Sequence, residues 1–348
     1  MSTATTTPAK PPVVNAYLDY GRPLWRRILF TREMAIIALL IAVLVVASIQ
    51  LPRFPTTLTV TNLLLDVTPI LLISLTMAPI MITGDIDLSV GSMVGLSSVV
   101  VGLLTQAGWS IPSAGLVAIV VGAVGGLVNG LLVTRFGLPA LAVTIGTLAL
   151  YRGLAIGLLG TTAITSFDRT WTKLAKSKIG ETGIPTVMIV FLVLLAIFAV
   201  LLHFTSFGRG VYAIGLSKDA AAFSGIHVAR TRVILFVLSG AMSALAGVFY
   251  TLRYTVARGD NAQGLELAVI AAVVLGGVSV FGGRGALHGV VAGVLLIGAL
   301  SNALRLASVT SDVINIITGV LLVLSVIAGS LMQWIQSRRV RPATTASA

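Results

Sequence analysis

The chain has 348 residues, of which 57% are hydrophobic and only 10% are charged, and its mean hydropathy is +1.05. Soluble domains average about 45–50% apolar and about 25% charged residues, so this composition excludes a soluble enzyme and a disordered regulator. The absence of cysteine excludes disulfides, thiol nucleophiles and thiolate metal sites. The net charge of +12 lies at the edges of apolar runs, where it indicates membrane topology rather than nucleic-acid binding.

Apolar runs of roughly 20 residues, the length that a helix needs to cross a membrane, recur along the chain. We therefore expect an all-α integral membrane protein, a polytopic bundle of about ten transmembrane helices. The ten predicted spans are 34–51, 63–83, 90–105, 111–133, 138–160, 184–202, 233–252, 265–281, 286–306 and 311–332. The third and eighth are short and flanked by glycine, which is typical of broken or re-entrant helices.

The predicted domain organisation is one transmembrane permease-like domain, 34–332, between an N-terminal tail, 1–33, and a C-terminal tail, 333–348. The N-terminal tail holds no short apolar run near its start, so a cleavable signal peptide is not expected. With both tails in the cytoplasm, the inside segments hold fourteen Lys and Arg and the outside segments hold eight. The positive-inside rule therefore favours cytoplasmic termini.

The longest predicted inside loop is 203–232. Its centre, Lys218–Phe223, is rich in alanine and is followed by Gly225, a plausible C-terminal cap, so it predicts a short helix on the cytoplasmic surface. A helix there needs a partner to contact. From the residues alone, a docking element and a plain solvated connector are equally open interpretations.

Several chemical signatures are absent from the sequence. There is no Gly-Lys pair and hence no Walker A loop, there is no GxSxG motif, and the three histidines are far apart. We therefore expect no catalytic residue, no metal ion and no cofactor, and conclude that the chain is not an enzyme. If transport consumes energy, a partner or an ion gradient must supply it.

Acidic residues in or beside spans are functional candidates, because an ionised side chain in hydrocarbon costs at least about 2.5–3.5 kcal/mol. The candidates are Asp66, Asp85, Asp87, Glu266 and Asp312. Asp87 or Ser89 could cap the helix that begins near Val90, and both aspartates of that segment could instead line a substrate path. Asp66, close to Pro69, predicts a span end or a kink.

Two glycine patterns accompany the spans. Glycines four residues apart, such as Gly122 with Gly126 and Gly153 with Gly157, predict close helix packing. In addition, the segment 84–91 is similar to the segment 276–283 at a constant offset, and both join an apolar span to a glycine-rich one. Such internal echoes are common in transporters, whose broken helices lie near the substrate path.

Four blocks carry a resemblance to a known family. They are ITGDIDLSVGSMVGL (82–96), NGLLVTRFGLPALAVTIGTLALYRGL (129–154), GRGVYAIG with SGI (208–215, 224–226) and LELAVIAAVVLGGVSVFGGRGALHGVVAGVLL (265–296). With these blocks in family order, the chain resembles from about residue 60 to 330 the permease subunits of bacterial ABC importers for monosaccharides, of the ribose/galactose/rhamnose type. RGD at 258–260 and FGG at 281–283 look like the rhamnose and autoinducer-2 branch.

The resemblance implies a multi-pass protein of the bacterial inner membrane that translocates a monosaccharide by alternating access. The implied partners are a cytoplasmic ATP-hydrolysing subunit, an extracytoplasmic sugar-binding protein, a second permease subunit and membrane lipid. By the same resemblance, the candidates for the substrate path are Asp85, Asp87, Asn129, Thr144 and Glu266. The residues expected to couple to the ATPase are Gly208, Arg209, Ala213, Gly215, Ala220, Ala221, Ser224 and Gly225.

The chain departs from the family pattern at two places. The usual acidic residue two places after Glu266 is Ala268 here, and the family's Gly-Gly or Gly-Asn pattern after the coupling tyrosine reads Gly215, Leu216 and Ser217. These departures concern the proposed path and the coupling loop, not the four blocks as a whole.

Two other functions remain alternatives. An ion-coupled secondary transporter could use the membrane carboxylates to relay protons. An intramembrane aspartyl protease carries two aspartates and a Pro-Ala-Leu triplet in the order seen at Asp66, Asp85 and 139–141, but the GxGD pattern fails at Ile82 and no tyrosine precedes Asp66.

Overall fold

The computed structural model describes residues 32–339. Residues 1–31 and 340–348, which make up most of the two predicted tails, lie outside the described range, so the tails stay a prediction. Within that range the chain is helical, and its only β contacts are isolated bridges between Ile164 and Ala257 and between Lys178 and Pro185.

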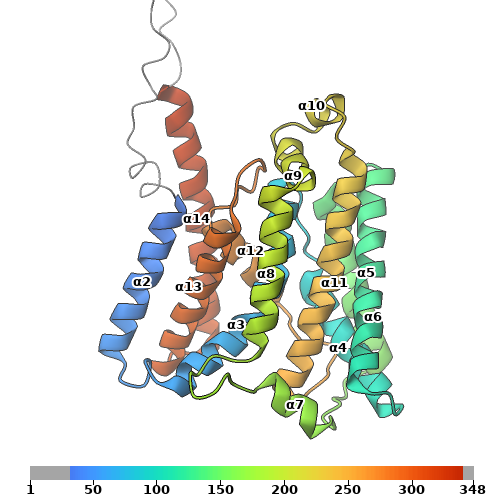
Figure 1. Ribbon diagram of the computed structural model, residues 1–348, viewed down its shortest axis with the longest axis vertical. Helices are drawn as coiled ribbons and strands as arrows, with labels where there is room; N and C mark the ends of the chain where they lie inside the picture. The colour runs from blue at the N-terminus through green and yellow to red at the C-terminus, as the bar shows by residue number, and fades with distance from the viewer. Residues whose placement is uncertain (1–31, 340–348) are drawn as a thin grey trace, which may run out of the picture.

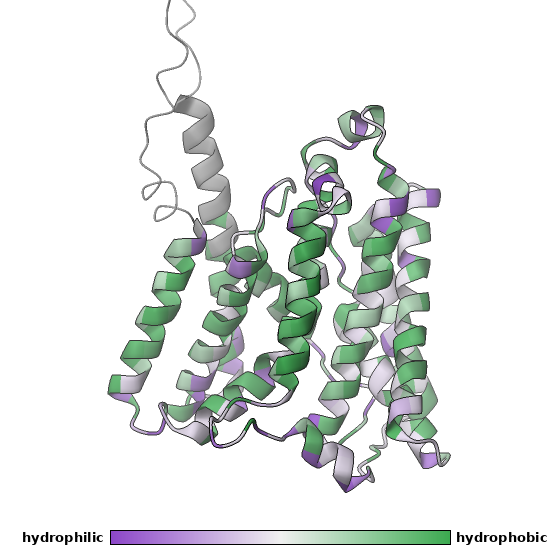
Figure 2. Cartoon of the chain, viewed as in Figure 1, coloured by the Kyte–Doolittle hydropathy of each residue, from purple (hydrophilic) through white to green (hydrophobic). Residues whose placement is uncertain are grey.

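The helices lie side by side, with the short helices 206–216 and 218–223 at one end of the bundle and the short helix 169–175 at the other (Figure 1). In chain order they are α2 (Arg32–Gln50), α3 (Thr57–Ile82), α4 (Val90–Gln106), α5 (Ile111–Arg135), α6 (Ala140–Leu159), α7 (Arg169–Ala175), α8 (Val187–Phe204), α9 (Ser206–Leu216), α10 (Lys218–Phe223), α11 (Val228–Tyr254), α12 (Leu265–Leu275), α13 (Leu287–Leu306) and α14 (Ser311–Arg339). Figure 2 shows apolar residues along the shafts and hydrophilic residues mostly at their ends, the pattern of a membrane bundle.

A helix occupies each of the ten predicted spans, but among the described residues only seven helices are long and apolar enough to cross a membrane: α2, α3, α5, α6, α8, α11 and α13. The structure therefore supports an all-α multi-pass membrane protein, but not the full count of ten crossings. The apolar helix α4 has 17 residues and α12 has 11, which give lengths of about 25 and 16 Å against about 30 Å of hydrocarbon. The part of α14 whose side chains are described, Ser311–Leu324, is apolar but shorter than the length that a crossing needs.

Helices α3 and α11 form the centre of the bundle, and 78% of the apolar stretch of α3 is buried. Helix α11 packs along α5 where the predicted glycine spacing occurs, because a Cβ on Gly126 would overlap the Phe236 carbonyl and one on Gly122 would overlap the Gly240 carbonyl. The close-packing prediction is confirmed for that pair. It is wrong for Gly153 and Gly157, since no described atom lies within 4 Å of a Cβ placed there.

Helix α3 runs unbroken past both of its internal prolines, Pro69 and Pro79. The expectation that Asp66 marks a span end is therefore wrong. Buried neighbours surround the helix on most sides, and proline inside a membrane helix is tolerated in such packing. Asp66 is held within the helix by side chains from α11 instead.

Helices α4 and α12 start inside the bundle. Asp87, which precedes α4, accepts a hydrogen bond from Ser239, the twelfth of the 27 residues of α11, so α4 begins near mid-depth. The first turn of α12 lies against the first turn of α4, where Glu266 meets Gly91. Two short helices of opposite direction thus meet at their N-termini, as expected for broken helices.

Candidate functional site

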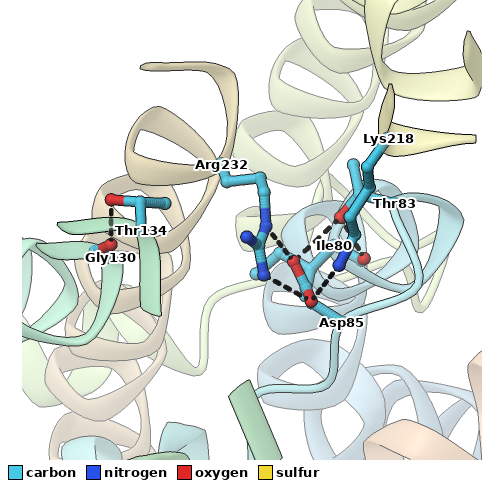
Figure 3. Close-up of polar contacts among 7 residues, drawn as sticks. All are labelled: Ile80, Thr83, Asp85, Gly130, Thr134, Lys218 and Arg232. Atoms are coloured by element: carbon cyan, nitrogen blue, oxygen red, sulfur yellow. Dashed lines mark hydrogen bonds and ion pairs between the residues drawn. The ribbon is translucent and has the colours of Figure 1, made fainter. Parts of the chain in front are cut away.

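Asp85, in the segment 83–89 between α3 and α4, forms a buried ion pair with Arg232 of α11. Arg232 Nε donates to Asp85 Oδ2 at 2.6 Å and Nη2 donates to Oδ1 at 2.7 Å, a bidentate geometry that Figure 3 shows. Lys218 of α10 adds a longer contact, Nζ to Oδ1 at 3.5 Å. The Asp85 carboxylate therefore connects the α3–α4 segment to both α10 and α11.

The two cations around Asp85 are not equivalent. Asp85 is 5% exposed and Arg232 is 12% exposed, whereas Lys218 is 47% exposed. Because screening by water weakens an exposed pair, the Arg232 contact dominates. Nothing in the sequence distinguished Arg232 from the other basic residues of the 203–232 loop, where it only counted towards topology.

Asp87, two residues on, is buried and holds a hydrogen-bond network. Its Oδ1 accepts from the backbone N–H of Ser89 at 3.0 Å and from the Ser89 hydroxyl at 2.6 Å, and its Oδ2 accepts from the Ser239 hydroxyl at 2.7 Å. Ser89 is the N-cap residue of α4, but its side chain makes no capping hydrogen bond. The cap interpretation is thus wrong for Ser89, and Asp87 acts by fixing the residue that precedes the helix.

Asn129 and Thr144 join the same cluster from α5 and α6. Asn129 Nδ2 donates to the Ser89 hydroxyl at 2.9 Å, and Thr144 Oγ1 donates to the Ile86 carbonyl at 3.1 Å. Both side chains are at most 1% exposed. The structure therefore brings four of the five path candidates together around the segment 83–89. Their polar atoms form hydrogen bonds that hold this segment in place, to neighbouring side chains and to the backbone.

Glu266, the fifth path candidate, lies apart from that network, in the first turn of α12. Its Oε2 atom is buried and has no hydrogen-bond partner among the described residues. Gly91 makes room for it, since a Cβ there would overlap that oxygen. Nearby, Arg152 donates to the carbonyls of Gly259 and Asn261 at 2.8 and 2.7 Å, which fastens the loop before α12 to α6.

The RGD sequence at 258–260 lies in that same loop. Arg258 donates to both oxygens of Asp260 at 2.8 Å, and both side chains are 49% exposed. The guanidinium holds the pKa of the Asp260 carboxyl below its usual range. An exposed pair of this kind contributes little to stability.

The predicted helix in the 203–232 loop is present as α10, and Gly225 follows it with a positive φ of 81°, the geometry of a glycine C-terminal cap. The preceding helix α9 was not predicted. Among the expected coupling residues, Arg209, Ala220, Ser224 and Gly225 are exposed, whereas Gly208 and Ala221 are buried. Ala213 and Gly215 are intermediate.

Helix α9 also contacts both breaks in the bundle. Gly215 fits against the Ile82 carbonyl and the Gly283 backbone N–H, where a Cβ would overlap both. Gly283 N–H donates to the Ile82 carbonyl at 2.8 Å, which joins the end of α3, just before the segment 84–91, to the segment 276–283 that is similar to it in sequence. Tyr212 OH donates to the Gly285 carbonyl at 2.8 Å, and burial raises the pKa of this hydroxyl, so it stays protonated. We call the contact of Gly215, Ile82 and Gly283 the glycine junction.

Comparison with known proteins identifies a family that this chain matches. A family model described as the permease component of the branched-chain amino acid transport system matches residues 59–326. The autoinducer 2 import system permease protein LsrD of Salmonella paratyphi A is 33% identical over 331 residues, which cover 90% of this chain and 98% of the relative. The protein of the same name from Escherichia coli is 33% identical over 332 residues, covering 91% and 99%. That of Yersinia enterocolitica is 33% identical over 281 residues, covering 77% and 84%. No solved structure matches the chain.

Proposed function

The chain belongs to the family of permease components of the branched-chain amino acid transport system, and from that premise we propose that it is the membrane subunit of an ATP-driven importer for a monosaccharide. It is a permease component of the sugar ABC importer family and not an enzyme. Similarity over nine-tenths of the chain to permeases named for autoinducer 2 import is the observation that carries the proposal. It favours autoinducer 2 or a rhamnose-like deoxysugar as the substrate.

The proposed partners follow from this role. The chain has no Walker A loop with which to bind ATP, so a cytoplasmic ATPase supplies the energy. An extracytoplasmic binding protein delivers the sugar. A second permease subunit completes the path between the two. The termini then lie on the cytoplasmic side of the bacterial inner membrane, with α9 and α10 facing the ATPase.

The contacts of α9 and α10 support a coupling role for the 203–232 loop. Phe223 and Leu216 are 93% and 74% exposed, which leaves apolar surface on α10 and at the end of α9 for a partner. On the opposite side, the Asp85–Arg232 pair and the glycine junction attach this loop region to both broken segments. A push on α10 would therefore move the segments 83–89 and 276–286 together.

The path candidates take a more limited role in this mechanism. Asp85, Asp87, Asn129 and Thr144 are buried, and their hydrogen bonds go to Arg232, Lys218, Ser89 and Ser239 or to the backbone. We propose that they set the shape of the path by positioning the segment 83–89. Direct contact between these residues and sugar stays a prediction.

The protease alternative fails on geometry. Asp66 lies within α3 and Asp85 lies beyond the end of that helix at Ile82, so the rise of the helix from Asp66 to Ile82 separates their backbones by about 24 Å. Each is also paired with a different arginine, Asp66 with Arg253 and Asp85 with Arg232. Two aspartates at that separation do not share one proton or one water.

The test is uptake in vesicles that contain the complete importer. We expect accumulation of radiolabelled L-rhamnose or autoinducer 2 that requires ATP hydrolysis and persists in the presence of an uncoupler. Uptake that collapses with the uncoupler and continues without the ATPase would establish the ion-coupled alternative instead.

A matched pair of variants tests the docking surface. Ala220 on α10 is exposed, so Ala220→Arg adds bulk and charge to the proposed ATPase face without touching the core. We expect at least a tenfold loss of uptake and loss of the co-purifying ATPase, with normal membrane insertion. Ala163→Arg, an exposed alanine in the 161–183 loop, is the control and should retain uptake. Ala221 is unsuitable because it is only 3% exposed. Full uptake and co-purification in Ala220→Arg would refute the coupling role.

A further inference from the structure

A cavity between α3, α12, α13 and α14 lies away from the Asp85–Asp87 cluster. Its volume is about 180 Å³, several times the roughly 30 Å³ that one water molecule occupies in the liquid and below the range of drug-sized pockets. Its occupant is therefore a small molecule. The six side chains that line it with polar or charged groups are Asp66, Ser301, Asn302, Arg305, Asn315 and Thr318.

The position of these residues in their helices places the cavity in one half of the membrane. Asp66 lies in the first half of α3, Ser301 and Asn302 lie in the last turns of α13, and Asn315 lies in the first turns of α14. All three positions are on the side opposite α9 and α10, which is the extracytoplasmic side in the proposed orientation. The close approach of α13 to α3 depends on Gly298, because a Cβ there would overlap the Val67 side chain.

Asp66 is held at the wall of the cavity by two donors from α11. Arg253 Nη2 and Tyr254 OH both donate to Asp66 Oδ1, at 3.3 and 3.2 Å. The second oxygen, Oδ2, makes no hydrogen bond to any described residue, and Asp66 remains 30% exposed. Arg253 thus balances the charge of this carboxylate, the two donors fix its position, and Oδ2 is left free to accept a hydrogen bond.

Asn302 provides the second unsatisfied group. Its Oδ1 atom is buried and has no hydrogen-bond partner among the described residues. A buried polar atom without a partner costs about 1–3 kcal/mol. Asn302 and Asp66 both line the cavity; Asp66 Oδ2 is the acceptor that is open to a solute there, and Asn302 Oδ1 is closed off from it.

The rest of the lining fits the same ligand. Arg305, Ser301 and the amide of Asn315 add donors, while Leu63, Ile70 and Ile297 supply apolar wall. Hydroxyl groups are donors and acceptors at once, and the C–H faces of a sugar pack against aliphatic side chains. A molecule with several hydroxyl groups on a small carbon frame satisfies both parts of the lining, whereas an apolar solute or an anion satisfies only one.

We propose that this cavity is a transient binding site for a small polyhydroxylated substrate, with Asp66 accepting a hydrogen bond from one of its hydroxyl groups and Ser301 and Asn302 in the same polar wall. The assignment rests on the proposed sugar import and names a stop on the path that lies outside the Asp85–Asp87 cluster. Ala268 in the first turn of α12 forms part of the wall, so the site adjoins one of the two broken helices.

The absence of native cysteine makes the test direct. In cells that express the complete importer, Ser301→Cys should react with a membrane-impermeant methanethiosulfonate reagent. Saturating L-rhamnose or D-ribose, whichever sugar the importer takes up, should slow that reaction at least threefold. Thr310→Cys, at an exposed position between α13 and α14, is the control and should react at a rate that the sugar does not change.

A pair of charge variants gives an independent readout. Asp66→Asn removes the charge from the cavity wall and should raise the KM of uptake about tenfold with little change at saturating sugar. Asp312→Asn removes a charge from an exposed position outside the cavity and should leave the KM unchanged.

Uptake with no sugar protection of Ser301→Cys and equal KM values for both variants would overturn the cavity assignment while leaving the proposed function intact. A Ser301→Cys protein that does not react, in cells where Thr310→Cys does, would overturn it as well. Failure of the importer to take up any sugar would refute the proposed function and this assignment with it.

Discussion

Asp85 accepts two hydrogen bonds from Arg232 of α11, while its own backbone N–H donates to the Ile80 carbonyl at 3.2 Å. One residue thus fixes the end of α3 to the start of α11. A buried pair of this kind is costly to break, because the remaining charge stays in a poorly solvated place. Replacing either residue therefore lowers the free energy of unfolding by more than the intact pair contributes to it.

We expect Asp85→Ala and Arg232→Ala each to destabilise the protein by about 3–5 kcal/mol. The double variant should be less destabilised than the sum of the two, because it leaves no unpaired charge. Lys218→Ala, whose contact is long and exposed, should cost less than about 1 kcal/mol. Thermal unfolding of the four variants in detergent checks this order, and additive losses in the double variant would contradict the pairing.

At the residue scale, the sequence was informative about which carboxylates matter and uninformative about what they contact. Asp85 and Asp87 stood out because charges near hydrocarbon are expensive. Arg232 and Ser239 could not be identified, since they lie 147 and 152 positions away and belong to ordinary residue types for their surroundings. Asn302 carried no signal at all, because its unpaired oxygen is a property of the packing around it.

At the scale of elements, the glycine junction joins α9 to the ends of two broken segments with no room for a side chain. Ile82 and Gly283 contribute backbone atoms, which do not move aside as the end of a flexible side chain would. A coupling contact of this kind transmits displacement because backbone packed against backbone is stiff.

We expect Gly215→Ala to insert into the membrane but to lose at least tenfold in uptake, because the added methyl group must separate α9 from Ile82 or Gly283. Gly153→Ala is the matched control: it adds the same group in α6 where no described atom lies within 4 Å. Uptake and ATPase stimulation by the binding protein are the measurements. Equal activity of the two variants would show that the junction transmits no movement.

Element prediction succeeded where a hydrophobic run or a cap governs the structure. Helix α10 and its glycine cap were predicted because local sequence determines a short capped helix. Helices α7 and α9 were missed because their amphipathic or polar residues fold against other parts of the chain. The predicted span 265–281 is too long, since α12 ends at Leu275, and Gly277 then takes a positive φ of 93°.

At the scale of the whole molecule, the chain is a bundle whose described residues include no cluster of His, Asp and Glu able to hold a metal ion. The sequence has no Walker A loop. Under the proposed function, partners supply the work of transport and the bundle provides the passage. Composition alone established the membrane class, whereas the depth of α4 and α12 required the packing of the complete bundle.

The isolated chain, reconstituted alone into liposomes, should neither hydrolyse ATP nor concentrate L-rhamnose. Addition of the ATPase, the second permease subunit and the binding protein should restore both activities. Phosphate release and radiolabel accumulation are the measurements. Accumulation by the chain alone, with or without a proton gradient, would contradict the division of labour proposed above.

The shortness of α12 has a consequence for the energy barrier to permeation. Its eleven residues span about 16 Å; its first turn, with Ala268, adjoins the cavity between α3, α12, α13 and α14, and its end leads to the loop that reaches the glycine junction. In the proposed path a hydroxyl-rich solute passes beside this helix, and it would lose its hydration over roughly half the thickness of the bilayer. The desolvation that a lipid membrane imposes on a sugar would then be confined to this shorter distance.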